Sequence, residues 1–327
     1  MLEIKVVALA GGVGGAKLVD GLSRILPSDS LTVIVNTGDD FDHLGLRICP
    51  DLDTVCYTLA GLANVTTGWG RKAETWNALQ SLAELGGPTW FRLGDRDLGT
   101  HLERTRLLAK GYTLSEVTKK FSEVWGIAPH VLPMSDDQIL TIVQSDEGEL
   151  GFQDYFVKRK CQPRVTGFYF AGIESAQPSP GVQKSLSEAE IVLICPSNPW
   201  VSIDPILAVP GIKEAVLDDK GRKQVIAVSP IIAGAAVKGP AAKMYLEMGL
   251  NPSAASAAQH YGSQDMGGLL NGFVFDHLDV DQDEEITGLG LATLVTNTLM
   301  KTLEDRIRLA EEVVDFGKKL IYGNMLP

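Results

Sequence analysis

Cysteine and histidine are scarce in this 327-residue sequence, and positive charge is outnumbered. The four cysteines, Cys49, Cys56, Cys161 and Cys195, are scattered without a C-x-x-C pair, so we expect reduced thiols and neither zinc sites nor disulfides. Lysine and arginine number 29 against 41 aspartates and glutamates, which gives a net charge of −12. This acidic balance argues against nucleic acid and anionic membranes as partners, but it is compatible with one phosphorylated small molecule.

Long apolar runs and the usual motifs of covalent catalysis are also missing. No apolar run approaches the ~20 residues of a membrane span. The start, "MLEIKVVALAGG", lacks the basic segment and cleavage site of a signal peptide, and we expect a cytoplasmic protein. The sequence has no G-x-S-x-G, no H-E-x-x-H and no close Cys–His pair, and its five histidines are dispersed. These absences favour direct transfer between two bound substrates over a covalent enzyme intermediate.

Strand-length apolar runs alternate with helical patterns at both ends of the chain. A strand is expected at 4–10, a helix at 16–26 and a second strand at 31–40. The pattern returns as strands expected at 189–200, 223–234 and 271–277, and as an amphipathic helix at 303–321. Because βαβ units give parallel strands, the sequence predicts an α/β fold with a parallel sheet between helical layers.

Residues 61–165 have a different texture, with helical stretches such as "AETWNALQSLAEL" and short irregular strands. We interpret this segment as a mainly helical insertion that caps the sheet. Residues 1–60 and 166–327 would then form the core.

A glycine-rich segment, "GGVGGAKL", separates the first strand from the first helix. Gly11, Gly12, Gly14 and Gly15 would let backbone N–H groups approach a phosphate, with Lys17 as a counter-charge. The segment lacks the G-K-[ST] ending of a P-loop and the third glycine of a dinucleotide fingerprint. A phosphate site of non-standard type is favoured, and a tight turn without a ligand is the alternative.

Acidic residues are concentrated after the second strand. Five aspartates fall within fifteen residues: Asp39, Asp40, Asp42, Asp51 and Asp53. Ligands of open α/β sheets bind at the carboxyl ends of strands, so some of these side chains could hold Mg²⁺ or accept hydrogen bonds from hydroxyl groups. The alternative is a set of solvated turn residues and helix caps, which we favour for Asp42 and keep open for Asp53.

Further polar candidates follow along the chain. The stretch 90–108 places Arg92 and His101 close to several charged residues. An arginine here could clamp a phosphate or stack on a ring, and the alternative is structural ion pairing. A turn follows Met134. Ser197, Asn198 and Ser229 come directly after buried strands. Parallel strands would deliver the strand-end residues to one edge of the sheet.

Eight motifs in order carry a family resemblance. They are "GGVGGAKLVDGL", "VNTGDD", "ICPDLDTV", "LGDRDLGTH", "LPMSDD", "FQDYFV", "PSNPWVSIDPIL" and "VSPIIAGAAVKGPAAKM". Together they resemble the 2-phospho-L-lactate transferases of deazaflavin coenzyme F-420 biosynthesis, from about residue 4 to residue 245. A more distant group of regulatory proteins shares that fold, but "ICPDLDT" with "LGDRD" is similar to the transferases.

The resemblance implies a Rossmann-like core with an inserted acceptor-binding subdomain, and a homodimer. It implies transfer of a phospholactyl-type group from a guanosine diphosphate-linked donor to the ribityl hydroxyl of the deazaflavin Fo, with release of GMP and a requirement for Mg²⁺. The glycine loop of this chain is "GGVGGAKL", whereas the form typical of archaeal members of the family is "GGTGTPKL". The identity of the three-carbon acid in the donor is therefore left open between phospholactate, phosphoenolpyruvate and phosphoglycerate.

The same resemblance assigns site residues. It matches Asp53 and Arg92 to residues that hold the acceptor, and from the chemistry of the transfer we hypothesise that Asp53 orients the attacking hydroxyl and accepts its proton. The full expected sets are Asp53, Arg92, His101 and Met134 for the acceptor; Gly11, Gly12, Gly14, Gly15, Lys17, Asn36, Thr37, Ser197, Asn198 and Ser229 for the donor; and Asp39, Asp40 and Asp53 for the metal. The alternatives are a nucleotide-sugar-binding regulatory protein of the same fold and a Rossmann oxidoreductase.

Overall fold

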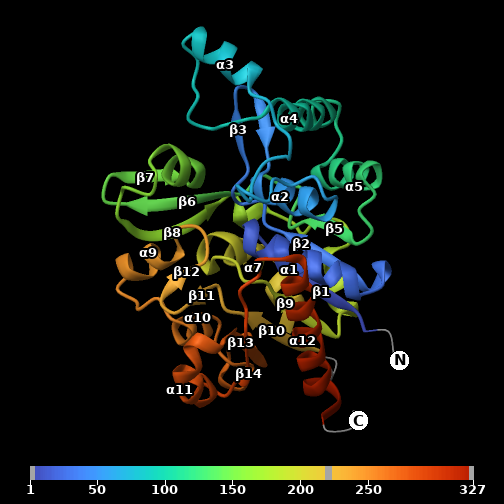
Figure 1. Cartoon of the computed structure of the whole chain (residues 1–327), viewed down its shortest axis with the longest axis vertical. Coiled ribbons are helices and arrows are strands. Elements are labelled where there is room, and N and C mark those ends of the chain that lie inside the picture. The colour runs from blue at the N-terminus through green and yellow to red at the C-terminus, as the bar shows by residue number, and fades with distance from the viewer. Residues whose placement is uncertain (1–3, 218–222, 324–327) are drawn as a thin grey trace.

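A seven-stranded parallel sheet forms the centre of the computed structural model, which describes residues 4–217 and 223–323 (Figure 1). All six strand pairs are parallel. In spatial order the strands are β14 (Ala292–Thr296), β13 (Gly272–Asp276), β10 (Gln224–Val228), β9 (Ile191–Ile194), β1 (Val6–Ala10), β2 (Leu31–Val35) and β5 (His130–Pro133). The order runs outward in both directions from β1 and β9, which makes that pair the switch point where ligands of such sheets bind.

Helices cover both faces of the sheet. Strand β1 sends Val6 and Ala8 to one apolar core and Val7 and Leu9 to the other, as the two-residue period of a strand requires. The first core is covered by α1 (Gly12–Ile25), α2 (Pro50–Leu59) and α12 (Leu303–Tyr322). The second is covered by α6 (Val182–Glu188), α7 (Asp204–Ala208), α8 (Ile212–Leu217), α9 (Ala241–Glu247), α10 (Ala254–Tyr261) and α11 (Asp283–Gly288). The predicted α/β class with a parallel core is confirmed.

The C-terminal helix α12 packs closely on α1 (Figure 1). A Cβ added to Gly21 would lie 2.1 Å from the carbonyl oxygen of Arg306, so only glycine permits this approach. Beside it, the Arg306 guanidinium pairs with the buried Asp20 carboxylate at 2.8 Å. A capping box of Thr302 and Asp305 starts α12 and satisfies its first backbone N–H groups.

Smaller elements extend from the carboxyl side of the sheet. The hairpin β3 (Phe41–His43) and β4 (Leu46–Ile48) lies with α3 (Asn77–Glu84), α4 (Asp95–Leu108) and α5 (Leu114–Trp125) in the upper part of Figure 1. A separate antiparallel sheet has the order β7-β6-β8, from β6 (Leu140–Ser145), β7 (Gly148–Gly151) and β8 (Val165–Ala171). The short pair β11 (Ile231–Ile232) and β12 (Ala235–Ala236) precedes α9.

Some expected boundaries differ from the structure. Strand β5 lies inside the segment 61–165 that we assigned to the insertion, yet it pairs with β2 in the core sheet. The chain therefore leaves the core sheet after β2, returns to it for β5 and leaves it again. The part that follows β5 contains the antiparallel sheet of β6, β7 and β8, so it is not mainly helical. Helix α1 begins at Gly12 and not at residue 16, so the glycine segment is its first turn. No described helix combines the length and apolarity needed to cross a membrane.

Candidate active site

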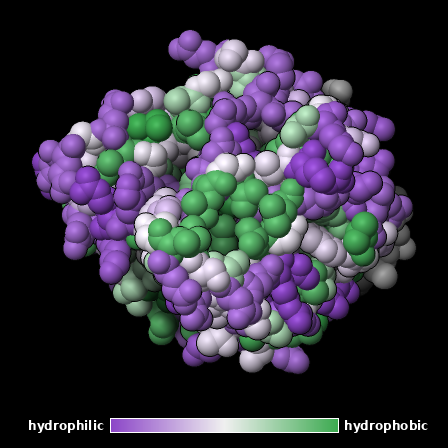
Figure 2. Space-filling model, turned by 90° about the horizontal axis from the view of Figure 1, so that it is seen from above, coloured by the Kyte–Doolittle hydropathy of each residue, from purple (hydrophilic) through white to green (hydrophobic). Residues whose placement is uncertain are grey.

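A cavity of about 480 Å³ opens at the carboxyl ends of the central strands. Its walls come from the start of α1, the start of α2, the segment 67–70, the segment 90–92, and the loops that follow β9, β10 and β14. Three half-exposed apolar side chains, Trp69, Phe156 and Val237, also line it. From above, apolar side chains gather in the middle of the face, ringed by hydrophilic ones (Figure 2), and such patches mark binding surfaces.

The glycine segment forms the floor of the cavity beside the switch point. Gly12 has a φ of +62°, and a Cβ at Gly14 would lie 2.2 Å from the Pro196 carbonyl oxygen. The Ser197 hydroxyl accepts from the Gly11 N–H at 3.3 Å and donates to the Gly11 carbonyl at 2.7 Å. These contacts fix the tips of β1 and β9 to one another, and they present the first N–H groups of α1 as a backbone site for phosphate.

Two buried carboxylates, those of Asp39 and Asp51, line the cavity next to this floor. Asp51 accepts a hydrogen bond from the Asn36 amide at 2.9 Å. Burial raises the pKa of Asp51 to about 6. Burial and then the neighbouring Asp51 raise the pKa of Asp39 well above its usual range. No described arginine or lysine pairs with either group, so the two repel each other when both are ionised.

A second acidic cluster lies around Asp53. The Arg104 guanidinium, itself buried, binds both carboxylate oxygens of Asp53, with Nη1 3.0 Å from Oδ2. His101 lies between two carboxylates, with Nδ1 3.7 Å from Asp53 and Nε2 3.3 Å from Asp97. The Tyr57 hydroxyl donates to Asp97 at 2.7 Å. Asp53, Tyr57, Asp97 and His101 all reach the cavity, whereas Arg104 supports them from behind.

Aromatic side chains lie on the side of the cavity that the segment 90–92 forms, near Trp76 and the hairpin β3–β4. The guanidinium carbon of Arg92 lies 4.4 Å from the centroid of the Trp76 ring, which holds the charge at the cavity edge. Trp90 and Phe91 pack against each other at 5.7 Å and against Phe41 of β3. A flat, uncharged ring system would find a stacking surface here.

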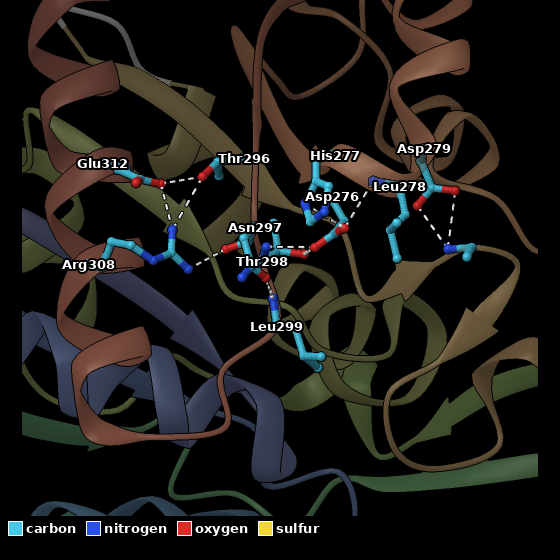
Figure 3. Close-up of polar contacts among 11 residues, drawn as sticks. Asp276, His277, Leu278, Asp279, Thr296, Asn297, Thr298, Leu299, Arg308 and Glu312 are labelled. Atoms are coloured by element: carbon cyan, nitrogen blue, oxygen red, sulfur yellow. Dashed lines mark hydrogen bonds and ion pairs between the residues drawn. The ribbon is translucent and has the colours of Figure 1, made fainter.

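The segment that follows β14 also lines the cavity, and Asp276 at the end of β13 supports it from behind (Figure 3). The buried Asp276 carboxylate accepts from the Thr298 backbone N–H at 2.8 Å and from its hydroxyl at 3.2 Å. This fixes the segment 298–300, which lines the cavity. The Met300 carbonyl then accepts a hydrogen bond from the Lys17 ammonium at 2.7 Å.

The structure gathers most of the expected site residues around one cavity and leaves others outside it. Those that line it are Gly11, Gly12, Gly14, Lys17, Asp39, Asp53, Arg92, His101, Ser197, Asn198 and Ser229. Those that do not are Gly15, Asn36, Thr37, Asp40 and Met134.

Three of these five residues lie outside the cavity for a clear physical reason. Asn36 is fully buried and uses its amide on Asp51 and on the Val201 carbonyl. Met134 is a core side chain behind β2, and its backbone N–H bonds to Val35. Asp40 lies beneath the cavity against the Cys49 thiol, where burial raises its pKa to about 8. The metal set expected from Asp39, Asp40 and Asp53 is not assembled, and no three described His, Cys, Asp or Glu side chains form a metal site.

Sequence reasoning named Asp51 only as one of five acidic candidates, and it did not single out Arg104. Asp51 stands in the same "DLD" as Asp53, and residues two apart on a helix point to opposite sides, which was the available signal. Arg104 follows His101 by three residues on α4, a spacing that places both on one helix face.

The fold and this cavity define an α/β protein with a phosphate-compatible ligand site at the switch point of a parallel sheet. Residues 6–287 match the family model described as 2-phospho-L-lactate transferase CofD, and the chain belongs to this transferase family. The resemblance noted from the eight motifs is thereby confirmed.

Individual relatives span nearly the whole chain. A Streptomyces griseus protein named phosphoenolpyruvate transferase is 40% identical, covering 97% of this chain and 99% of its own length. A Methanosarcina mazei protein named 2-phospho-L-lactate transferase is 39% identical, covering 94% and 99%. A crystal structure of a UPF0052-family protein from Bacillus halodurans superposes with a TM-score of 0.64 at 15% identity, covering 96% and 99%, which supports the fold alone.

Proposed function

We propose that this protein transfers a phospho-acid group from a guanosine diphosphate-linked donor to the ribityl hydroxyl of Fo and releases GMP. One observation carries the proposal: the glycine floor and the two acceptor candidates, Asp53 and Arg92, line the same cavity. A donor diphosphate on the N–H groups of α1 would face an acceptor that enters between the aromatic side chains of segment 90–92.

The chemistry requires positioning and charge neutralisation. The acceptor oxygen attacks the phosphorus that carries the three-carbon acid, the bond from that phosphorus to the GMP oxygen breaks, and GMP departs with the electron pair while the hydroxyl loses its proton. Bringing the two reactants together in line supplies much of the rate in such reactions. The backbone N–H groups of the floor would bind the non-bridging phosphate oxygens.

Mg²⁺ fits the Asp39 and Asp51 pair. Mg²⁺ is commonly held by one or two carboxylates together with substrate phosphates. The pair lies beside the glycine floor, and the Oδ1 atom of Asp39 is buried without a hydrogen-bond partner in the described residues. A bound Mg²⁺ would neutralise charge on the diphosphate. This assignment replaces Asp40 and Asp53 of the expected set with Asp51.

Asp53 is proposed to orient the acceptor hydroxyl. Arg104 already binds both of its oxygens, so its carboxylate is fixed in direction before any ligand arrives. A hydroxyl that donates to the remaining lone pairs would be aimed towards the donor. Arg92 is proposed to contact the acceptor from the cavity edge.

The donor acid is proposed to be phosphoenolpyruvate, with phospholactate second. The Streptomyces griseus relative carries the first name and the Methanosarcina mazei relative the second. We also propose that the protein acts as a homodimer in the cytoplasm.

The test is direct. The purified protein is mixed with Fo, Mg²⁺ and one guanosine donor at a time, carrying phosphoenolpyruvate, phospholactate or phosphoglycerate, and the products are weighed by mass spectrometry. We expect one donor to give GMP and Fo enlarged by the phospho-acid, and to fail when EDTA removes Mg²⁺. Absence of product with all three donors would overturn the proposal and favour a nucleotide-binding regulatory role.

A further inference from the structure

Two lysines face the cavity without a carboxylate partner. Lys17 on α1 and Lys238 in the loop between β12 and α9 both line it. Among the described residues no Asp or Glu lies within ion-pair distance of either ammonium, although the chain has 41 acids. Both ammonium groups therefore face a cavity that several aspartates also line, yet neither is bound by a carboxylate.

Each ammonium is held by a neutral carbonyl. Lys17 donates to the Met300 carbonyl at 2.7 Å, and Lys238 donates to the Thr67 carbonyl at 2.8 Å. The two charges also influence each other: burial, then Arg306 and Lys238, lower the pKa of Lys17, and the more weakly acting Asp305 raises it. A carbonyl satisfies one of the three N–H groups of an ammonium and leaves the other two free to bind an anion.

The two anchors differ in how firmly they are built. The Met300 carbonyl belongs to the wall that Asp276 fixes through Thr298 (Figure 3). The Thr67 carbonyl belongs to an exposed turn whose hydrogen bonds are local, between Asn64, Thr67 and Trp69. Lys238 is exposed and can leave Thr67 at little cost, whereas Lys17 is half-buried and fixed.

The turn itself admits Lys238 closely. A Cβ at Gly68 would lie 2.4 Å from the Lys238 ammonium and 3.2 Å from Val13 of the glycine floor. Lys238 thus sits between the floor of the cavity and the turn 64–70, at the point where a donor bound on α1 would project its terminal group.

We propose that Lys238, together with Lys17, binds a terminal anionic group of the donor, and that Lys238 exchanges the Thr67 carbonyl for this anion. The group is either the second phosphate or the carboxylate of the three-carbon acid attached to it. The inference rests on the proposed function and adds a residue that determines donor specificity, since a donor without this anion would leave two cations unsatisfied.

Lys238→Met and Lys238→Gln remove the charge from an exposed side chain, so the fold is retained, which thermal melting verifies. Lys110→Met, at an exposed lysine remote from the cavity, is the matched control. We expect the donor KM to rise roughly 10- to 100-fold in both Lys238 variants, the range for losing one charge-assisted hydrogen bond. The Fo KM should stay unchanged, and Lys110→Met should match the parent in both.

Calorimetric titration with GDP and GMP identifies the anion. Weaker GDP binding with unchanged GMP binding assigns Lys238 to the second phosphate. Unchanged GDP binding with a raised donor KM assigns it to the carboxylate. An unchanged donor KM together with unchanged GDP binding overturns the inference. If the parent protein proves inactive towards Fo, calorimetric titration with the guanosine donor itself replaces the donor KM: unchanged binding of both donor and GDP by the Lys238 variants overturns the inference, so its failure is distinguishable from failure of the proposed function.

Discussion

Asp51 and Asp53 stand two residues apart in the first turn of α2, yet their surroundings are opposite in charge. Asp51 faces the glycine floor and the second buried carboxylate, Asp39, with an amide as its side-chain partner. Asp53 faces α4, where the Arg104 guanidinium binds both of its oxygens. Two helical residues separated by about 200° face different neighbours, so one short motif serves two sides of the same cavity.

The difference separates two tasks that a group-transfer site requires. A carboxylate pair without a protein cation is destabilised by itself, and it is relieved by a cation that arrives with the substrate. A carboxylate that is permanently paired is stable without ligand and keeps a fixed direction. We infer that the Asp39–Asp51 side is built for a reversible partner and the Asp53–Arg104 side for orientation.

The largest effect is expected from breaking the ion pair between Asp53 and Arg104, which we call the compensated side of the cavity because a cation neutralises its carboxylate. Arg104→Met would leave Asp53 buried beside Asp97 without its cation, and removal of one partner from such a pair costs about 3–5 kcal/mol. Urea unfolding should show a fall of this size in the free energy of unfolding. The double variant Arg104→Met/Asp53→Asn should recover much of it. Arg106→Met, which removes an exposed pair with Glu103 on the same helix, should change little. Equal stability of the Arg104 variant and the parent would show that Asp53 does not depend on the guanidinium.

On the uncompensated side, formed by Asp39 and Asp51, removal of a charge should increase the free energy of unfolding. Asp39→Asn removes one of two repelling carboxylates, so the protein without Mg²⁺ should become more stable while turnover falls about 10²–10³-fold, as for loss of one electrostatic contact to the reacting group. Calorimetry should show weaker Mg²⁺ binding. Asp42→Asn is the matched control, because Asp42 is mostly exposed and pairs with Arg47 outside the cavity. A variant that loses both stability and activity would indicate that Asp39 has a structural role.

Much of this arrangement could be read from the sequence. The five expected strands of the core are present. Continuous apolar runs of this length are typical of strands that are buried on both faces of a sheet. Strands β5 and β14 were not predicted, since "HVLP" is very short and "ATLVT" mixes threonine with small apolar residues at the edge of the sheet.

The cavity was predictable to the extent that strand ends determine it. Glycines, Ser197, Asn198 and Ser229 follow strands directly, so the parallel sheet brings them together. The partner of each charge was not predictable. Arg104 reaches Asp53 from 51 residues further along the chain, and Asn36 turns inward to Asp51 because a buried carboxylate needs a donor.

Stability should fall as pH rises through the weakly acidic range. The folded-state pKa of Asp51 is about 6 and that of Asp40 about 8, both above the unfolded value because of burial. The folded protein therefore holds protons that the unfolded chain has released, so the contribution of these two groups to the free energy of unfolding is greatest near pH 4 and falls towards pH 8.

We expect the Asp51 contribution to be on the order of 1–3 kcal/mol. Saturating Mg²⁺ should offset it above pH 6, because the ion binds the ionised Asp39 and Asp51, whereas the loss from Asp40 should remain. Urea unfolding between pH 4 and pH 8, with and without Mg²⁺, measures both. A free energy of unfolding that rises over this range, or that Mg²⁺ leaves unchanged, contradicts the assignment.

The smallest effect is expected at the edge of the cavity, where Arg92 and Trp76 are proposed to influence the KM for Fo. Arg92→Ala should raise the Fo KM about 10-fold, because a hydrogen bond from a charged donor is lost, and leave the donor KM unchanged. Trp76→Ala keeps the guanidinium but removes the ring beneath it, 4.4 Å away. A cation–π contact at an exposed site is worth about 0.5–1 kcal/mol, so the Fo KM should rise only two- to fivefold. In the double variant the two effects should not add, since Trp76 acts through Arg92. Additive effects would instead mean that Trp76 touches the acceptor itself and that the aromatic surface extends to the outer edge of the cavity.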